Sequence, residues 1–181
     1  NLPNYGANDG ALFFPLNDCE YRDYRPQLNA LAYYFNQTDL YGEGAWTEDR
    51  HWYNTSSLKT KNNSFNLQRT PTATFLEGGY YIQREKESLT FIRCGNHKDR
   101  PSHADNLHLD IWYQGKNMVR DAGTFMYNTT PEMLSFFMGT KGHNTVMLGE
   151  HDQMKKGARF IWLNWSQANS AKIFTENNTT T

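Results

Sequence analysis

The residues best suited to chemistry gather in and just after one stretch, RPSHADNLHLDIWYQGKNMVRDAGTFMYN, residues 100–128. His103 stands near its beginning, Asp121 stands near its end, and His143 follows shortly after in KGHNTVML. Two imidazoles and one carboxylate are ligands that zinc accepts in a tetrahedral shell. The sequence therefore predicts a zinc site at these three residues.

A β-hairpin is expected to bring the ligands together. Residues 107–112, LHLDIW, alternate with a period of two, which is typical of a half-buried strand. Residues 114–117, QGKN, favour a turn because Gly and Asn tolerate positive φ, and residues 118–120 return as a second strand. The two ends of a hairpin lie on the same side of a sheet. Residues 143–148 are expected to form another strand, so the three candidate ligands can meet.

Each candidate ligand also has an ordinary structural interpretation. His103 can cap a turn, and His143 can be a core histidine with satisfied hydrogen bonds. Asp121 can pair with Arg120 or cap the turn that follows it. His108, within the first strand, is interpreted as a packing or hydrogen-bonding residue between strands. At the level of the sequence, the metal site and these interpretations both stay open.

Composition excludes several classes of protein. The 181 residues are enough for one domain, or one domain and a fragment. With 18 basic and 19 acidic residues, nothing favours nucleic acid or an anionic membrane as a partner. No apolar run approaches the roughly 20 residues needed to span a bilayer. Two cysteines, Cys19 and Cys94, do not make a disulfide scaffold, and whether they pair stays open.

The first 70 residues are expected to be helices and loops. Residues 23–35, DYRPQLNALAYYF, make the best helix, because Asp23 can cap it and Pro26 suits only a first turn. Its leucines and Phe35 recur at helical spacing and predict one apolar face. A second short helix is expected near Thr47.

From Pro71 onward the pattern changes to short strands separated by turns. Strands are expected at 72–76, 80–84, 88–93, the hairpin, 143–148, 159–165 and 171–174. Turn signals about every ten residues favour an antiparallel sandwich. We therefore predict a mainly β fold, an antiparallel β-sandwich in residues 71–181, preceded by a helical segment in residues 1–70.

Five motifs in order carry a resemblance to a known family. They are PNYGANDGALFFPL, GGYYIQR, the stretch of residues 100–128, KGHNTVMLGEHDQM and RFIWLNWSQA. Together they resemble the heparinase II/III-like proteins, which are bacterial polysaccharide lyases and their relatives. The resemblance implies an α/α toroid followed by a supersandwich-like β-sandwich. Residues 1–70 would then be the end of the toroid, and residues 71–181 the first part of the sandwich, in a fragment of a larger protein.

The resemblance also implies a chemistry. These lyases cleave uronic-acid-containing glycans by β-elimination, in which a base removes the C5 proton and an acid protonates the leaving oxygen. By motif position, a structural zinc would be held by His103 in SHAD, Asp121 in RDAG and His143 in GHNT. An acidic polysaccharide would be the partner. For the compartment, the resemblance favours the periplasm or cell envelope of a bacterium.

One position departs from the family. A catalytic His is expected two residues before the metal His, where this chain has Pro101, which cannot act as acid or base. Tyr127 in FMYN becomes the catalytic candidate, with His97 as a weaker one. An alternative function is a non-catalytic sandwich that binds glycan or has a structural role in a polysaccharide assembly system. The fragment alone is expected to be inactive.

Overall fold

The computed structural model describes residues 3–8, 16–36, 39–53, 69–168, 171–173, 175–176 and 179–180. The chain divides into two units, one formed by Asp9–Arg69 and the other by Asn1–Asn8 together with Thr70–Thr181. The first unit contains α1 (Arg25–Asn36), η1 (Ala45–Thr47) and α2 (Glu48–Trp52). The second contains the sheet and every predicted ligand.

The helix α1 begins where the sequence predicts. The carboxylate of Asp23 accepts a hydrogen bond from the backbone N–H of Arg25 at 3.0 Å, and Pro26 lies in the first turn. The predicted apolar face of Leu28, Leu31, Ala32 and Phe35 is only partly buried: Ala32 is 3% exposed, but Leu28 and Leu31 are 40% and 47% exposed. The helix also buries Asn29, whose side chain accepts a hydrogen bond from the Leu40 N–H and donates one to Asp39.

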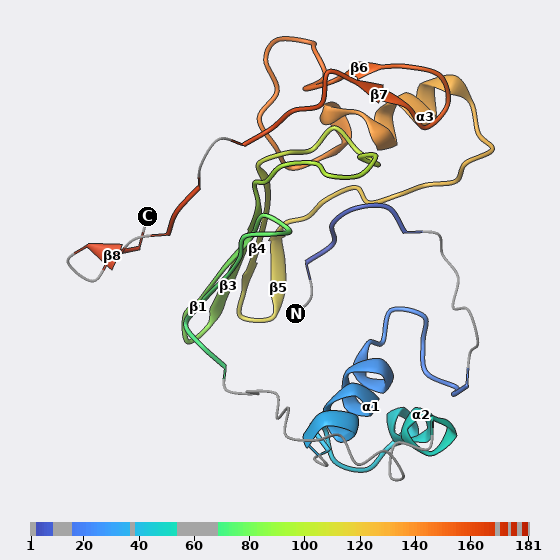
Figure 1. The fold of residues 1–181 in the computed structure, drawn as a ribbon, viewed down its shortest axis with the longest axis vertical. Coiled ribbons are helices and arrows are strands. Elements are labelled where there is room, and N and C mark those ends of the chain that lie inside the picture. The colour runs from blue at the N-terminus through green and yellow to red at the C-terminus, as the bar shows by residue number, and fades with distance from the viewer. Residues whose placement is uncertain are drawn as a thin grey trace. The chain divides into compact units, whose positions relative to one another are not determined.

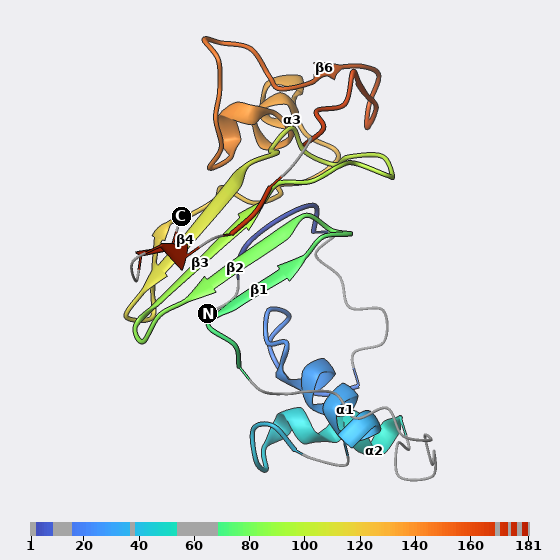
Figure 2. The ribbon, with the colours of Figure 1, turned by 60° about the vertical axis from the view of Figure 1, so that its left-hand side comes forward.

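Five antiparallel strands form the sheet of the second unit, in the order β1-β2-β3-β4-β5 (Figures 1 and 2). Their bounds are Thr72–Phe75, Tyr80–Arg84, Ser88–Arg93, His108–Tyr113 and Lys116–Val119. Each of these strands was predicted, the one at 107–112 from its alternation and the others from short runs bounded by turn signals. The β4–β5 turn is tighter than predicted, because it uses only Gln114 and Gly115, both with positive φ (47° and 76°). A two-residue loop of this kind suits the twist of a hairpin.

The polar side of β4 is its more deeply buried side. His108 and Asp110 are fully buried, and they pair with Arg93 and Phe91 of β3 on the same face of the sheet. Leu107, expected in the strand, is 49% exposed and adopts a positive φ of 65°, so β4 begins one residue later.

Residues 3–8 lie against this buried face, although they precede it by some 70 residues or more. The ring of Tyr5 lies 5.6–6.0 Å, between centroids, from the rings of Tyr80, Phe91 and His108. The backbone N–H of Asn4 donates to the Asp110 carboxylate at 3.3 Å. The N-terminal segment and the sheet therefore form one packed unit.

A helical segment that the sequence analysis did not predict follows the sheet. It comprises α3 (Pro131–Met138) and the turn η3 (Thr140–Gly142). Both lie with β6 (Lys155–Lys156) and β7 (Trp162–Leu163) at one end of the sheet (Figures 1 and 2). A small core joins them, formed by Ala104, Met138, Met154 and Trp162.

Three strand predictions fail in this region. Residues 143–148 form no regular strand, only an isolated bridge between Leu148 and His151. The predicted strand at 159–165 is reduced to β7, and residues 171–173 are not in a strand, while residue 174 lies outside the described residues. The short strands β8 (Thr175–Glu176) and β9 (Thr179–Thr180) pair near the C-terminus.

The structure also describes the two cysteines and the length of the helices. Cys19 and Cys94 are free thiols. Across the described residues, every helix is too short or too polar to cross a bilayer.

Candidate metal centre

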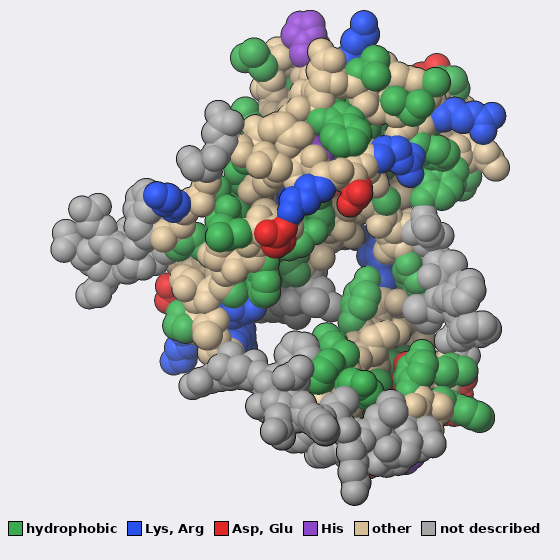
Figure 3. Space-filling model, in the orientation of Figure 1, with side chains coloured by type: hydrophobic (Ala, Val, Ile, Leu, Met, Phe, Trp, Pro, Cys, Tyr) green, Lys and Arg blue, Asp and Glu red, His purple; other side chains and the backbone are tan. Residues whose placement is uncertain are grey.

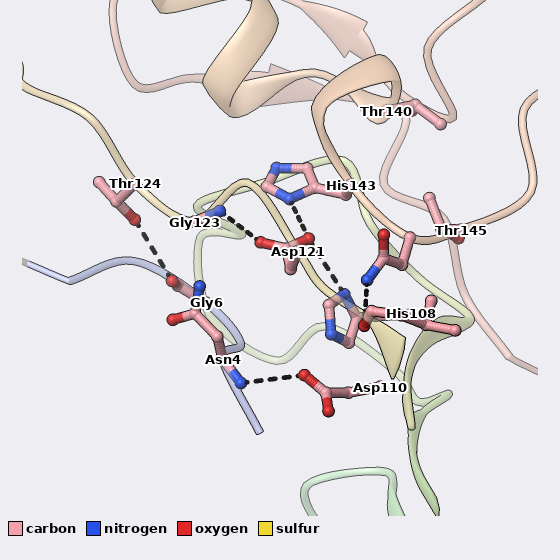
Figure 4. A network of polar contacts seen from close by, with 12 residues as sticks. Asn4, Gly6, His108, Asp110, Asp121, Gly123, Thr124, Thr140, His143 and Thr145 are labelled. Carbon is pink, nitrogen blue, oxygen red and sulfur yellow. Dashed lines mark hydrogen bonds and ion pairs between the residues drawn. The ribbon is translucent and has the colours of Figure 1, made fainter. Parts of the chain in front are cut away.

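The pair formed by Asp121 and His143 lies at the middle of the candidate site. The Nδ1 atom of His143 is 2.9 Å from Oδ2 of Asp121. Both side chains are almost completely buried. Figure 4 shows Asp121 between two imidazoles, with His143 on one side and His108 on the other. The His108 Nδ1 atom is 3.6 Å from the same carboxylate oxygen, which is longer than a hydrogen bond.

His103 and Asp105 complete the cluster. The His103 ring stacks on that of His143, with centroids 4.5 Å apart. His103, Asp105 and His143 each offer a ligand atom, and these three atoms lie within 4.8 Å of one another. Two of the three predicted ligands, His103 and His143, belong to this group, while Asp121 adjoins it through its hydrogen bond to His143. The carboxylate in the group is Asp105, which the sequence analysis did not single out. The spacing His-x-Asp in SHAD was a signal that could have identified it.

The loop that carries His103 and Asp105 is fixed through Ala104, the residue between them. Ala104 is fully buried, and its N–H donates to the Met138 carbonyl at the end of α3. Its own carbonyl accepts from the Thr140 hydroxyl at 2.8 Å. Both backbone groups of Ala104 are therefore held by the α3–η3 segment, which also leads to His143.

Asp121 is fixed by the turn that follows β5. Its Oδ1 accepts from the backbone N–H of Gly123 at 2.6 Å. Gly123 has a φ of 75°, and a Cβ there would lie 2.8 Å from the Asn4 side chain. Only glycine suits this position without strain.

His143 lies directly after the turn η3 that follows α3, and not on a strand. A Cβ on Gly142 would lie 2.3 Å from the Phe136 carbonyl oxygen, so glycine allows the close approach. The next residue, Asn144, accepts from the Leu109 N–H at 2.9 Å and donates to the Val119 carbonyl at 2.8 Å. Since β5 ends at Val119, this loop occupies the place beside β4 that a longer β5 would have taken.

Burial dominates the electrostatics of the site. It lowers the pKa of His103 to about 4, with the His143 ring adding to the effect. Burial also lowers the pKa of His108 and raises the pKa of Asp105. For the central pair, burial is outweighed: Asp121 raises the pKa of His143, and His143 together with the Gly123 N–H lowers the pKa of Asp121.

The hydrogen bonds of His143 call for a positive charge at its Nδ1 atom. Its Nε2 atom lies 3.1 Å from the Phe137 carbonyl oxygen, which can only accept, so Nε2 carries a hydrogen. A neutral ring would then direct the Nδ1 lone pair at the Asp121 carboxylate. At 2.9 Å the two atoms are at hydrogen-bond distance, so a proton on Nδ1 removes this repulsion.

Other atoms of the site lack partners. Nδ1 of His103, Oδ2 of Asp105 and both ring nitrogens of His108 are buried and have no hydrogen bond within the described part of the chain. Buried polar atoms without a partner are rare, and a metal ion is one means of satisfying them. Imidazole nitrogens and carboxylate oxygens are ligands that zinc accepts.

A pocket of about 320 Å³ opens beside the cluster. Its lining includes Tyr5, Glu77, Tyr80, Arg93, His97, Lys98, Asp99, Arg100, Pro101, His103 and Asp105. Figure 3 shows basic and acidic side chains next to one another on the visible face of the sheet unit. Tyr127 is not among the lining residues; it is 48% exposed, and its ring packs edge-on against Phe160. Tyr5, which the sequence analysis did not propose, places its ring in the wall of this pocket.

The His97 imidazole in the pocket is not free, because it contacts the guanidinium group of Arg93. Its Nδ1 atom is 3.1 Å from a guanidinium nitrogen of Arg93, and burial lowers the pKa of His97 to about 4. The same guanidinium group donates to Asn106 at 2.9 Å. His97 therefore helps to hold Arg93 at the pocket.

The sheet unit corresponds to a known protein family. The model of the heparinase II/III-like C-terminal region matches residues 67–181. The chain belongs to the heparinase II/III-like family. The mainly β, sandwich-like fold predicted from the sequence is confirmed by this membership together with the five-stranded antiparallel sheet.

Solved structures similar to this heparinase II/III-like chain are much longer. A crystal structure of heparinase III is 23% identical with a TM-score of 0.41, over 49% of this chain and 16% of that one. A heparinase III gene product with methylated lysines is 23% identical with a TM-score of 0.42, over 57% of this chain and 17% of that one. The matched part thus spans about a sixth of their length. No curated protein matches the chain.

Proposed function

We propose that this chain is the sandwich part of a polysaccharide lyase that cleaves uronic-acid-containing glycans by β-elimination. The observation that carries the proposal is the buried cluster of His103, Asp105, Asp121 and His143 beside a pocket lined by aromatic rings and by charged side chains of both signs. Membership in the heparinase II/III-like family supports it. Solved proteins named heparinase III share a similar stretch, which makes an acidic polysaccharide the substrate class to test.

Zinc is the ion we propose for the cluster, with His103, Asp121 and His143 as its ligands. When bound, zinc would tie the hairpin, the SHAD loop and the α3–η3 segment together, and it would supply positive charge next to the pocket. The second imidazole near Asp121, His108, would help to orient the carboxylate.

The pocket side chains would hold the glycan. Arg93 and Arg100 provide guanidinium groups that can pair with a sugar carboxylate, and Tyr5 and Tyr80 offer ring faces for sugars. Charge on the substrate carboxylate rises when the C5 proton leaves, so a fixed cation beside it stabilises the transition state.

The proton acceptor is the open part of the mechanism. Pro101 lines the pocket where the family resemblance implies a catalytic His, and proline has no group that can take a proton. We propose a tyrosine in its place. Tyr127 is the candidate from the sequence, and Tyr5 is one of two tyrosines, with Tyr80, in the lining of the pocket.

An ultraviolet absorbance assay tests the lyase function, because β-elimination creates a C4–C5 double bond conjugated to a carboxylate. The protein encoded by the complete gene should be mixed with heparan sulfate, alginate and other uronate glycans. We expect absorbance to rise with at least one glycan. Substituting the catalytic tyrosine, Tyr5→Phe or Tyr127→Phe, should reduce the rate at least ~100-fold, the lower end of what general acid–base catalysis contributes.

A second function is favoured by Pro101 specifically. A sandwich that keeps the metal cluster but lacks the catalytic His could bind glycan without cleaving it. In that case glycans would bind the complete protein, as measured by calorimetry, with no rise in absorbance. That result would reject the lyase proposal for the glycans tested.

A further inference from the structure

Asp105 is a buried carboxylate that no hydrogen bond explains. The residue is 2% exposed, and its Oδ2 atom has no partner among the residues that the structure describes. Two other buried carboxylates nearby accept hydrogen bonds. Asp121 accepts from the Gly123 N–H, and Oδ2 of Asp110 accepts from Asn4 and Asn117, while Oδ1 of Asp110 is buried without a partner in the described structure. Asp105 differs from Asp110 in lying next to ligand atoms of His103 and His143, so an ion shared with these imidazoles can compensate its desolvation.

The position of Asp105 relative to the histidines suits a shared ion. Ligand atoms of His103, Asp105 and His143 lie within 4.8 Å of one another. Around a zinc ion with bonds of about 2.1 Å, two tetrahedral ligand atoms are about 3.4 Å apart. The three atoms therefore need to approach one another by no more than about 1.4 Å. Because Ala104 is held through both of its backbone groups, the loop presents His103 and Asp105 to the site as one fixed piece.

We propose that Asp105 is a direct ligand of the metal ion and completes, with His103, Asp121 and His143, a shell of four protein side chains. This inference rests on the metal centre of the proposed function. Two neutral imidazoles and two carboxylates carry a charge of −2, which balances a divalent ion and leaves a neutral centre in a buried place. A shell of four protein ligands has no open position, as in structural zinc sites, so the ion would hold the fold and would not bind substrate.

The test compares Asp105→Asn with Asp99→Asn, a matched control. Asp99 lines the same pocket but is exposed, so its carboxylate is not part of the cluster. Zinc affinity should be measured for the complete protein by competition with a chelating dye. We expect Asp105→Asn to weaken zinc binding at least ~10-fold, and Asp99→Asn to leave it within about 2-fold.

Cobalt substitution adds a readout of the coordination shell itself. Co²⁺ in the wild-type site should give the intense visible bands of a four-coordinate ion, and Asp105→Asn should shift or weaken them. Unchanged affinity and an unchanged cobalt spectrum in the variant would overturn the inference. Asparagine has nearly the same size as aspartate, so the metal-free variant should fold at least as well as the wild type. Failure of that variant to fold would also count against the proposal, because it would show that the carboxylate is needed without metal.

These measurements also distinguish the role of Asp105 from the existence of the metal centre. A wild-type protein that takes up neither zinc nor cobalt would contradict the metal centre. A wild-type protein that binds zinc while Asp105→Asn binds it equally well would contradict only the role of Asp105.

Discussion

His103 offers an imidazole nitrogen that the protein itself does not satisfy. Its Nδ1 atom is buried without a hydrogen bond in the described structure, and its ring stacks on His143. We predict that His103→Ala weakens zinc binding at least ~100-fold, beyond the roughly 10- to 100-fold typical of outer-shell changes. Elemental analysis of purified protein measures this as a fall from about one zinc per chain to nearly none.

His151→Ala is the matched control for that experiment. His151 is exposed and lies in the same unit, outside the cluster. Its substitution should leave the zinc content unchanged. Full zinc content in His103→Ala would remove this residue from the ligand set.

Single residues differ in how far the sequence can locate them. His103, Asp121 and His143 belong to motifs with polar residues near predicted strand ends, so their proximity was predicted from a hairpin and a following strand. The structure instead positions His143 in the turn after α3. Tyr5 could not be placed, because it is about 100 residues away from His103 in the chain and reaches the pocket through the packing of residues 3–8 on the sheet. No local pattern encodes that contact.

Among the elements, the α3–η3 segment holds the loop of His103 and Asp105 in place. Thr140 provides the side-chain hydrogen bond between the segment and that loop. Its hydroxyl donates to the Ala104 carbonyl and accepts from the Gln153 N–H at 2.9 Å. We predict that Thr140→Val lowers the free energy of unfolding by about 2–4 kcal/mol, because it leaves two backbone groups without partners. Chemical denaturation measures the change.

Thr74→Val provides the comparison at this scale. Thr74 is exposed on β1, and its substitution should change the free energy of unfolding by less than about 0.5 kcal/mol. Equal effects of the two substitutions would show that the Thr140 hydroxyl does not hold the loop.

The elements were predictable where they repeat a simple period. Alternation located β4, and turn signals between short apolar runs located the other four strands of the sheet. Residues 143–148 look like a strand but bond to the edge of β4 through Asn144 alone, so tertiary contacts replaced the ladder. The helix α3 was missed although Thr130 caps it and Pro131 opens it, which together are a readable start signal.

At the scale of the whole molecule, the buried histidines make stability depend on pH. The pKa of His103 falls from 6.5 to about 4 on folding, so the unfolded chain takes up a proton first as the pH drops. This disfavours the folded state by about 2 kcal/mol at pH 5 relative to pH 7.5. Burial of His108 acts in the same direction. The raised pKa of His143 acts in the opposite direction, since its contribution is present at low pH and lost as the pH rises.

We therefore predict that the metal-free protein loses stability between pH 7.5 and pH 5. Asp121 does not alter this range, because its lowered pKa affects stability only at more acidic pH. Thermal melting in the presence of a chelator measures the change, and His103→Asn should make the curve flatter. The raised pKa of Asp105, like that of His143, favours the folded state as the pH falls. A melting temperature that rises toward pH 5 would mean that these two groups outweigh His103 and His108.

The packing of residues 3–8 on the sheet affects where a recombinant sheet domain can begin. A recombinant domain that starts at residue 70 would lack Tyr5 and Asn4, and would open the rings of Tyr80 and Phe91 and the carboxylate of Asp110 to water. Such a product would be prone to self-association through this uncovered face. A synthetic peptide of the first eight residues, supplied separately, is the natural means of restoring it.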